Sequence, residues 1–236
     1  MLPSILILLI THNDIYFDVS IGCLIVVGES TVGQIPPIKV ALRGANITFY
    51  CTFPVFQEES DVKVQWWRHG DDEFLNDGEA SNRQYKLLKK GGAAIHLLNV
   101  SFKDSGRYYC SVYCRGGMFG NGTGSELLVA VPPTPLRIDL VESEFRPSTS
   151  PILLCKTAKF YPEDLNVTWY KNNAKIVTGI NTTKQQTRVG LYEISSTLKD
   201  TTLSYSGATY SCQVSHVSLE TPANVSYNLE GHPGNN

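Results

Sequence analysis

The residues of this chain with the clearest chemical potential are its six cysteines, Cys23, Cys51, Cys110, Cys114, Cys155 and Cys212. The sequence separation of Cys51 and Cys110 is nearly the same as that of Cys155 and Cys212, and this repeated spacing predicts two similar units, each closed by one disulfide. A closed loop of this size stabilises a domain by about 4 kcal/mol in the chain-entropy account. Because such bonds persist only in oxidising compartments, we expect the chain to follow the secretory route.

Asn-x-Ser/Thr sequons support the same compartment. One sequon means little by chance, but several beside paired cysteines favour a glycoprotein. The candidate glycosylated residues are Asn46, Asn99, Asn121, Asn166, Asn181 and Asn224.

The first 28 residues are the least regular part of the chain. Apolar stretches at 4–10 and 19–28 are separated by polar residues, and neither reaches the roughly 20 residues of a membrane-spanning helix. We interpret residues 1–28 as a signal peptide that lacks the usual basic start, with a misassigned first exon as the alternative. In either case Cys23 is expected to be lost with this segment.

Loss of Cys23 would leave Cys114 as an odd thiol. An unpaired cysteine in a secreted protein indicates an intermolecular disulfide or a reactive thiol. A buried free thiol is an equally good interpretation, and the sequence does not choose between them.

The sequence contains no pattern typical of a metal site, a nucleotide-binding site or a catalytic site. No His, Cys, Asp or Glu spacing suggests a zinc or calcium site, and no phosphate loop or nucleophile elbow is present. We therefore expect no cofactor, no metal and no enzymatic activity. The net charge is -2, without a long basic run, so nucleic-acid binding is not expected.

The remaining chain reads as short strands separated by Gly, Asn and Asp turns, which predicts an all-β protein. Its 236 residues suffice for two domains. We place them at 32–131 and 132–230, with the proline-rich 132–135 as an elbow and 231–236 as a disordered tail. No apolar span follows the second domain, so the protein is either secreted or cut short of a membrane anchor.

Two motifs in the first domain resemble a variable-type immunoglobulin domain. Cys51, Trp66 and Cys110 give a Cys…Trp…Cys frame, and Asp104-x-Gly106-x-Tyr108-x-Cys110 resembles the turn into strand F. The resemblance implies that Trp66 packs on the disulfide and that the Tyr108 hydroxyl bonds to upstream backbone.

Two further features follow from the same resemblance. The family pairs the Asp of this motif with an Arg at the start of strand D, so Asp104 is expected to pair with Arg83. The segment Gly122–Val129 resembles the joining strand of antigen receptors, whose glycines permit a bulge.

The second domain resembles a constant-type (C1) immunoglobulin domain at three motifs in order, Cys155–Pro162, Val167–Asn172 and Tyr210–His216. Trp169 and Tyr210 would hold its core. The resemblance therefore implies two tandem immunoglobulin-like β-sandwiches, variable type and then C1 type. This combination is similar to antigen-receptor chains, signal-regulatory proteins and the natural cytotoxicity receptor 3 group with its butyrophilin-like ligands.

The family resemblance implies extracellular immune recognition, by a receptor or a ligand that binds another cell-surface protein. If Trp66, Tyr108 and Leu127 point inward, strand alternation turns their neighbours outward onto one face. Large aromatics on an open face favour a protein interface, although such aromatics are common in these domains and neighbours can shield them. The expected contacts on this face are Gln65, Trp67, Tyr109 and Leu128.

The loop between strands F and G is the second candidate binding element, because its aromatic, Arg and Gly residues supply contact area and adaptability. Its expected contacts are Tyr113, Arg115, Met118 and Phe119. An ordinary hairpin loop is the alternative. The C1-type domain would act as a spacer and could carry a homodimer contact. Homophilic adhesion and a soluble decoy remain alternative functions.

Overall fold

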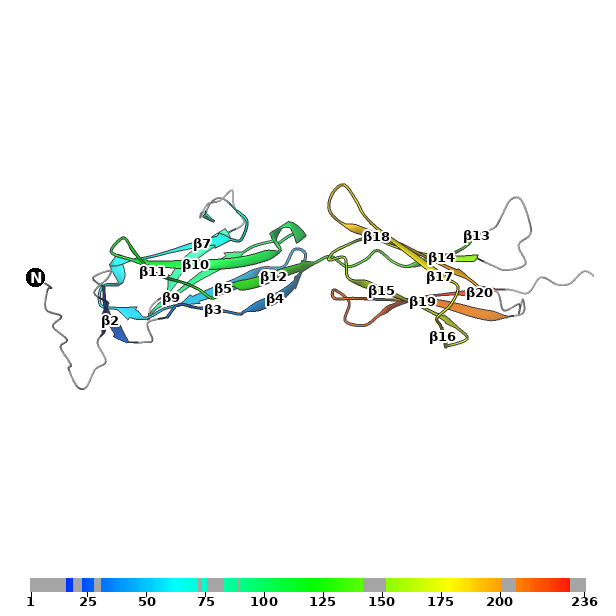
Figure 1. Cartoon of the computed structure of the whole chain (residues 1–236), viewed down its shortest axis with the longest axis horizontal. Coiled ribbons are helices and arrows are strands. Elements are labelled where there is room, and N and C mark those ends of the chain that lie inside the picture. The colour runs from blue at the N-terminus through cyan, green and yellow to red at the C-terminus, as the bar shows by residue number, and fades with distance from the viewer. Residues whose placement is uncertain are drawn as a thin grey trace, which may run out of the picture. The chain divides into compact units, whose positions relative to one another are not determined.

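The computed structural model describes residues 16–18, 23–27, 31–71, 74–75, 83–88, 90–141, 152–200 and 207–229. The predicted tail and most of the predicted signal peptide lie outside these residues. The chain divides into two units, Met1–Val129 and Ala130–Asn236, and both are built from strands (Figure 1). No helix in the described part of the chain is long and apolar enough to cross a membrane.

The first unit is formed mainly by two sheets. In the first, which we call the front sheet, the strand order is β11-β10-β12-β4, and β7 pairs with β10. Its strands are β4 (Ile38–Leu42), β7 (Val62–Arg68), β10 (Gly106–Cys114), β11 (Gly117–Asn121) and β12 (Ser125–Ala130). The second, the back sheet, has the order β3-β5-β9-β8. Its strands are β3 (Gly33–Ile35), β5 (Ile47–Thr52), β8 (Arg83–Leu88) and β9 (Gly92–Leu97).

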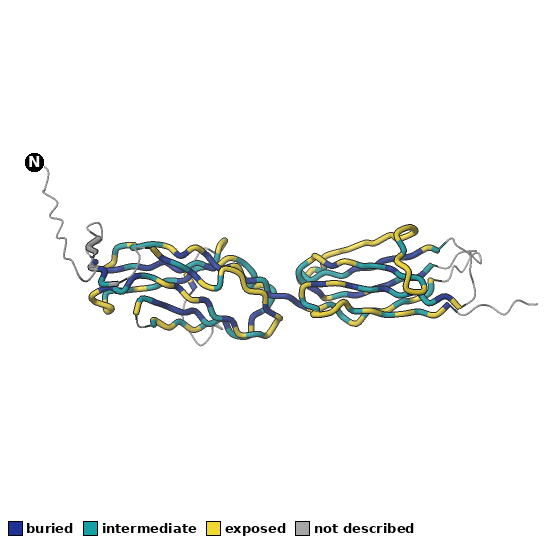
Figure 2. The backbone as a smooth tube through the Cα atoms, turned by 90° about the horizontal axis from the view of Figure 1, so that it is seen from below, coloured by how far each residue is buried: buried dark blue, intermediate teal, exposed yellow. Residues whose placement is uncertain are grey.

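The core of the first unit lies between these sheets, and buried residues alternate with more exposed ones along strands such as β5 (Figure 2). The Cys51–Cys110 disulfide joins β5 to β10 and so links the two sheets. Trp66 is only 1% exposed. Tyr108 is fully buried and donates its hydroxyl proton to the carbonyl of Asp104 at 2.6 Å, the tyrosine-corner bond that the motif led us to expect.

A third, smaller sheet changes the interpretation of the N-terminal segment. It contains β1 (Tyr16–Asp18), β2 (Cys23–Val27) and β6 (Val55–Phe56) in that order. Cys23 and Ile25 of β2 are buried in the core of the first unit, next to Phe56. Residues 23–27 are therefore part of the folded unit in this structure, whereas we had assigned them to a removable leader.

Cys23 forms a disulfide with Cys114, and this pairing corrects two expectations. Cys114 is not an odd thiol, and Cys23 is a buried part of the folded unit in this structure. Cys114 is almost fully buried. The sequence argument failed because the apolar run around Cys23, which resembles a leader, forms a core strand instead.

The second unit is also a two-sheet sandwich. One sheet has the order β13-β14-β18-β17, and the other has the order β16-β15-β19-β20. The strands of the first are β13 (Arg137–Val141), β14 (Ile152–Phe160), β17 (Ile180–Gln186) and β18 (Tyr192–Lys199). Those of the second are β15 (Leu165–Lys171), β16 (Ala174–Ile176), β19 (Ala208–His216) and β20 (Ala223–Leu229).

Inter-sheet contacts hold the second unit together much as they hold the first. The Cys155–Cys212 disulfide joins β14 to β19. Trp169 is fully buried and donates from Nε1 to the Ser196 hydroxyl at 2.9 Å. Tyr210 differs from Tyr108 of the first unit, since its hydroxyl donates to the Asp200 carboxylate rather than to a backbone carbonyl. The prediction of an all-β fold with two immunoglobulin-like sandwiches is confirmed.

The proline-rich segment 132–135 is attached to the second unit. Val131 exchanges backbone hydrogen bonds with Tyr161, and the Thr134 amide donates to the Ala158 carbonyl at 2.9 Å. These bonds anchor the segment at both ends of the proline run. The segment therefore belongs to the second unit.

Candidate protein-binding face

The outward side of the front sheet carries a stacked aromatic pair. Trp67 of β7 and Tyr109 of β10 are cross-strand partners, and their ring centroids lie 4.5 Å apart at an interplanar angle of 17°. Trp66, Tyr108 and Cys110 are buried, so alternation turns Trp67 and Tyr109 toward solvent. Both rings are half-buried.

A glycine and an arginine hold the Tyr109 ring in place. Gly124 has a φ of +88, and a Cβ there would lie 2.8 Å from Cε1 of Tyr109. Only glycine therefore lets this backbone pass beside the ring. The Arg107 guanidinium lies 5.6 Å from the ring centroid and donates to the Thr123 carbonyl. Gly124 of the joining-like segment thus contributes to the aromatic pair directly.

An apolar stripe continues this face along β4 and β12. Leu127 and Val129 are buried, so Leu128 points outward, where it is half-buried. Ala41 is buried likewise, which turns the other apolar residues of β4 outward. We define the apolar stripe as Ile38, Val40 and Leu42, with exposed fractions of 68%, 46% and 50%. Sequence reasoning missed these three residues, although their alternation in Ile38-x-Val40-x-Leu42 was the available signal.

Gln65 extends the face on the other side of the aromatic pair. It is the cross-strand partner of Ser111 on β10, and Ser111 in turn partners Asn121 on β11. The Ser111 hydroxyl donates to Oδ1 of Asn121 at 2.7 Å. A row of three polar side chains therefore borders the Trp67–Tyr109 stack.

The expected F–G loop is a continuous β-hairpin instead. Strands β10 and β11 remain paired up to Cys114 and Gly117, which leaves a two-residue turn at Arg115 and Gly116. Their φ values of 48 and 80 lie in the left-handed region, as tight hairpin turns require. The Cys23–Cys114 disulfide fixes the end of β10. The element is thus braced rather than adaptable.

The four expected contacts of this hairpin have different surroundings. Met118 is exposed and Tyr113, its cross-strand partner, is half-buried. Phe119 packs edge-on against Phe56 at 5.1 Å, so it contributes to the core. Arg115 is exposed and forms ion pairs with acidic residues at the edge of the unit.

The ion pairs of Arg115 limit what this residue offers a partner. Its Nε lies 2.7 Å from a carboxylate oxygen of Asp61, and its Nη2 lies 3.5 Å from Glu58. The hydrogen bond to Asp61, followed by the charges of both carboxylates, raises the pKa of the Arg115 guanidinium. A partner carboxylate would have to compete with these groups.

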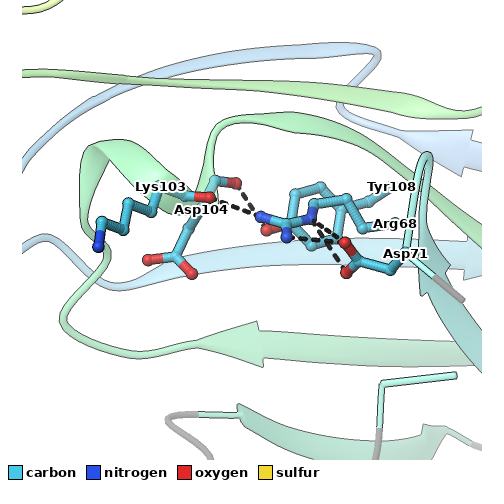
Figure 3. A network of polar contacts seen from close by, with 5 residues as sticks. All are labelled: Arg68, Asp71, Lys103, Asp104 and Tyr108. Carbon is cyan, nitrogen blue, oxygen red and sulfur yellow. Dashed lines mark hydrogen bonds and ion pairs between the residues drawn. The ribbon is translucent and has the colours of Figure 1, made fainter. Parts of the chain in front are cut away.

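The corner between β9 and β10 is organised by Arg68 (Figure 3). Its guanidinium pairs with the Asp71 carboxylate at 2.8 Å and donates to the Lys103 carbonyl at 2.6 Å. Burial raises the pKa of Tyr108 to about 12, although the positive charge of Arg68 opposes this shift. The network holds the corner from which β10 starts.

Arg83 does not make the predicted pair with Asp104. The Asp104 carboxylate accepts hydrogen bonds from the backbone amide and hydroxyl of Ser101, at 2.7 and 2.9 Å. Among the described residues, no ion pair links it to Arg83. The carboxylate instead closes a capping box on the short 3-10 helix η2 (Phe102–Asp104).

Gln34 is the structural residue that sequence reasoning missed. It is 5% exposed and lies on β3, yet its amide reaches the front sheet. Nε2 donates to the Tyr108 carbonyl and the Ser125 hydroxyl, while Oε1 accepts from the amides of Cys110 and Gly124. One side chain therefore fixes both strands beside the aromatic pair. A single Gln next to prolines gives little signal of this role.

All six candidate glycosylation residues lie on the surface. They are Asn46, Asn99, Asn121, Asn166, Asn181 and Asn224. No cluster of three His, Cys, Asp or Glu side chains in the described part of the chain could hold a metal ion.

Comparison with known proteins gives relatives from immune systems. Residues 140–219 match the immunoglobulin C1-set domain family, so the second unit is a C1-set domain. The chain is 28% identical to the tapasin-related protein of Mus musculus over 210 residues, which covers 81% of this chain and 45% of that protein. It is also 28% identical to the natural cytotoxicity triggering receptor 3 ligand 1 of Homo sapiens over 212 residues, with 82% and 42% covered.

A shorter match is to the SMH class II histocompatibility antigen beta-1 chain of Spalax ehrenbergi, with 34% identity over 87 residues. It covers 36% of this chain and 33% of that relative. The chain spans less than half the length of these curated relatives. Together with the two sandwiches and their disulfides, these matches support an immune-related protein of the immunoglobulin superfamily.

Proposed function

We propose that the first unit is a variable-type immunoglobulin domain that binds a protein partner of the immune system, as a receptor or a ligand outside the cell. The observation that carries this proposal is the Trp67–Tyr109 stack on the outward side of the front sheet. Trp and Tyr dominate the energetic centres of protein interfaces, because they supply large apolar area at a low cost in conformational entropy.

The apolar stripe supports the same face. Ile38, Val40 and Leu42 keep about half or more of their surface in contact with water. Contiguous large apolar side chains cost free energy when they remain exposed to water, and such patches often mark interaction surfaces on soluble domains. Half-buried Leu128 belongs to the outward side of the neighbouring strand.

The edges of the face are polar, as an interface rim is expected to be. Gln65 borders the stack on one side, and Arg107 borders it on the other, where it covers the Tyr109 ring. Met118 at the hairpin end adds one exposed, adaptable contact. In this proposal the C1-set unit acts as a spacer. The names of two relatives, a receptor ligand and a tapasin-related protein, are compatible with protein recognition.

The proposal is tested by a binding screen of immune cells with oligomerised, secreted protein. Trp67→Ala and Tyr109→Ala are expected to abolish cell binding. The matched control is Tyr50→Ala, because Tyr50 is a 40% exposed tyrosine on the back sheet and should leave binding intact. Thermal unfolding verifies that each variant is folded. Equal binding by all three variants would contradict the proposed face.

Homophilic adhesion is the alternative that the same protein can test. Differently tagged copies that capture each other through Tyr109 would show that the partner of this face is a second copy.

A further inference from the structure

We propose that Asn166 and Asn224 both carry N-linked glycans, and that these two glycans cover the outward side of one sheet of the C1-set unit. The sheet contains β16, β15, β19 and β20 in that order (Figure 1). A covered sheet takes no protein partner. The proposal concerns the second unit alone, so it does not depend on the binding role proposed for the first.

The outward side of this sheet is polar but uncharged along three adjacent strands. Trp169 on β15, Cys212 on β19 and Leu229 on β20 are buried, so their neighbours in each strand turn outward. The outward residues are Ser, Thr, Asn, Gln and a single Tyr. We define the polar face as Asn166, Thr168, Tyr170, Thr209, Ser211, Gln213, Ser215, Asn224, Ser226 and Asn228.

The polar face lacks the side chains that anchor protein partners. Interface centres are enriched in Trp, Tyr, Met and Arg, whereas Ser and Thr are under-represented there. The one aromatic residue, Tyr170, is already engaged, because its hydroxyl donates to Oε1 of Gln213 at 3.1 Å. The hydroxyls of Ser211 and Ser226 lie 2.8 Å apart and bond to each other. These side chains therefore satisfy one another without a partner.

The two sequons lie on either side of β19 on this face. Asn166 of β15 is the cross-strand partner of Ser215, and Asn224 of β20 is the cross-strand partner of Gln213. Both asparagines are exposed. From the spacing of strands and of alternate residues, they lie about 12 Å apart with β19 between them. Each glycan therefore has to extend over only one strand to cover the outward side of β19.

The chemistry of the polar face suits sugars. Hydroxyl and amide side chains both donate and accept hydrogen bonds, as the hydroxyls of a sugar do. A glycan is bulky and hydrated, and it belongs on the surface of a protein. Because β15, β19 and β20 present no charged side chain on this side, sugars can lie against them without removing water from a charge.

The opposite sheet of the same unit has a different character. Arg137 of β13 and Lys156 of β14 are exposed cross-strand partners, and Val141 is 41% exposed. The sequon of this sheet, at Asn181, lies on β17, at the other end of the strand order from β13. A lateral contact of the C1-set unit is therefore expected along β13 and β14 and not on the polar face.

A cysteine introduced at Ser215 gives a direct test, because all six native cysteines form disulfides. The full chain with Ser215→Cys is secreted from eukaryotic cells that make high-mannose glycans. Peptide mapping after enzymatic deglycosylation in heavy-oxygen water measures occupancy at Asn166 and Asn224. An endoglycosidase then trims each glycan of the folded protein to one sugar, and the rate of labelling by a maleimide on a large polyethylene glycol is measured before and after.

We expect both asparagines to be modified, and we expect trimming to raise the labelling rate about tenfold, because it removes the bulk beside the thiol. Iodoacetamide is small and should label the thiol at similar rates in both forms. Asn166→Gln combined with Asn224→Gln should have the same effect as trimming. The matched control is the same pair of substitutions in a Lys156→Cys protein, whose thiol is on the opposite sheet and should react at an unchanged rate.

Two results would overturn the proposal. The first is an unmodified Asn166 or Asn224 in the secreted protein, and the second is an equal rate of polymer labelling at Ser215→Cys with and without the glycans. Neither readout uses a partner of the first unit, so a failure here is separate from a failure of the proposed function.

Discussion

Trp67 and Tyr109 stack face to face across β7 and β10, with ring centroids 4.5 Å apart, on the solvent side of the front sheet. Their inward neighbours Trp66 and Cys110 belong to the core. The same two strands therefore build the disulfide-centred core with one side and the candidate recognition surface with the other.

The stack should contribute coupling energy beyond the area that each ring buries. Aromatic pairs in this geometry interact by about 1 kcal/mol in double-mutant cycles. We expect that value for Trp67→Ala combined with Tyr109→Ala, from urea unfolding of the four proteins. A matched cycle of Trp67→Ala with Tyr50→Ala, on the other sheet, should give no coupling. A coupling near zero for the first pair would show that the stack is not maintained in solution.

The Cys23–Cys114 disulfide should leave no free thiol in the native protein. Mass spectrometry after alkylation without reduction is expected to find both residues unlabelled, and electrophoresis without reductant should show a monomer. Because the bond closes a loop of 91 residues, Cys23→Ser should lower the free energy of unfolding by up to about 4 kcal/mol. Labelling of Cys114 in the folded protein, or a covalent dimer, would refute the pairing.

Gln34 should be essential for the stability of the first unit. Gln34→Leu removes an amide that bonds to Tyr108, Cys110 and Gly124, and it leaves buried backbone groups without partners. Each such group costs about 1–3 kcal/mol, so we expect a loss of at least 2 kcal/mol in denaturant unfolding. Gln84→Leu, at an exposed position of β8, is the matched control and should change stability little. Similar losses for both would argue against the Gln34 network.

Tyr108 should make the first unit sensitive to alkaline pH. Burial raises its pKa from 10.0 to about 12, so in the unfolded chain the hydroxyl ionises first. The stabilisation is complete below pH 10 and is lost as the pH rises toward 12, by about 2–3 kcal/mol in total. Unfolding free energies measured between pH 9 and 12 should fall less steeply for Tyr108→Phe. Parallel curves for the two proteins would contradict this assignment.

The loss of the Tyr108 hydroxyl also has an effect at neutral pH. Tyr108→Phe removes the 2.6 Å bond to the Asp104 carbonyl and should cost about 1 kcal/mol there. The pH comparison therefore uses the slopes of the two curves and not their absolute levels.

Much of the fold could be predicted from the sequence because its main determinants are local or regularly spaced. Alternating apolar residues indicated strands, and the matched cysteine spacing indicated two units. The motifs around Trp66, Tyr108 and Trp169 indicated which side of each strand turns inward. Alternation then placed Trp67 and Tyr109 on one outward face.

Tertiary structure decided the features that depend on contacts between distant residues. Cys23 pairs with Cys114 because β2 joins the core, and no local pattern distinguishes such a strand from an apolar leader. Asp104 bonds to Ser101 rather than to Arg83, since the amide and hydroxyl donors of a residue three positions away in the same turn are already in place.

The surface shows the same division. The sequence by itself determined that aromatic residues alternate with core residues on β7 and β10, because side-chain direction has a period of two. Only the tertiary structure placed β11 beside β10 and β4 beside β12 in the same sheet, with Asn121 on β11 and the apolar stripe on β4. Strand order depends on long-range packing, and adjacent positions in the sequence carry little information about it.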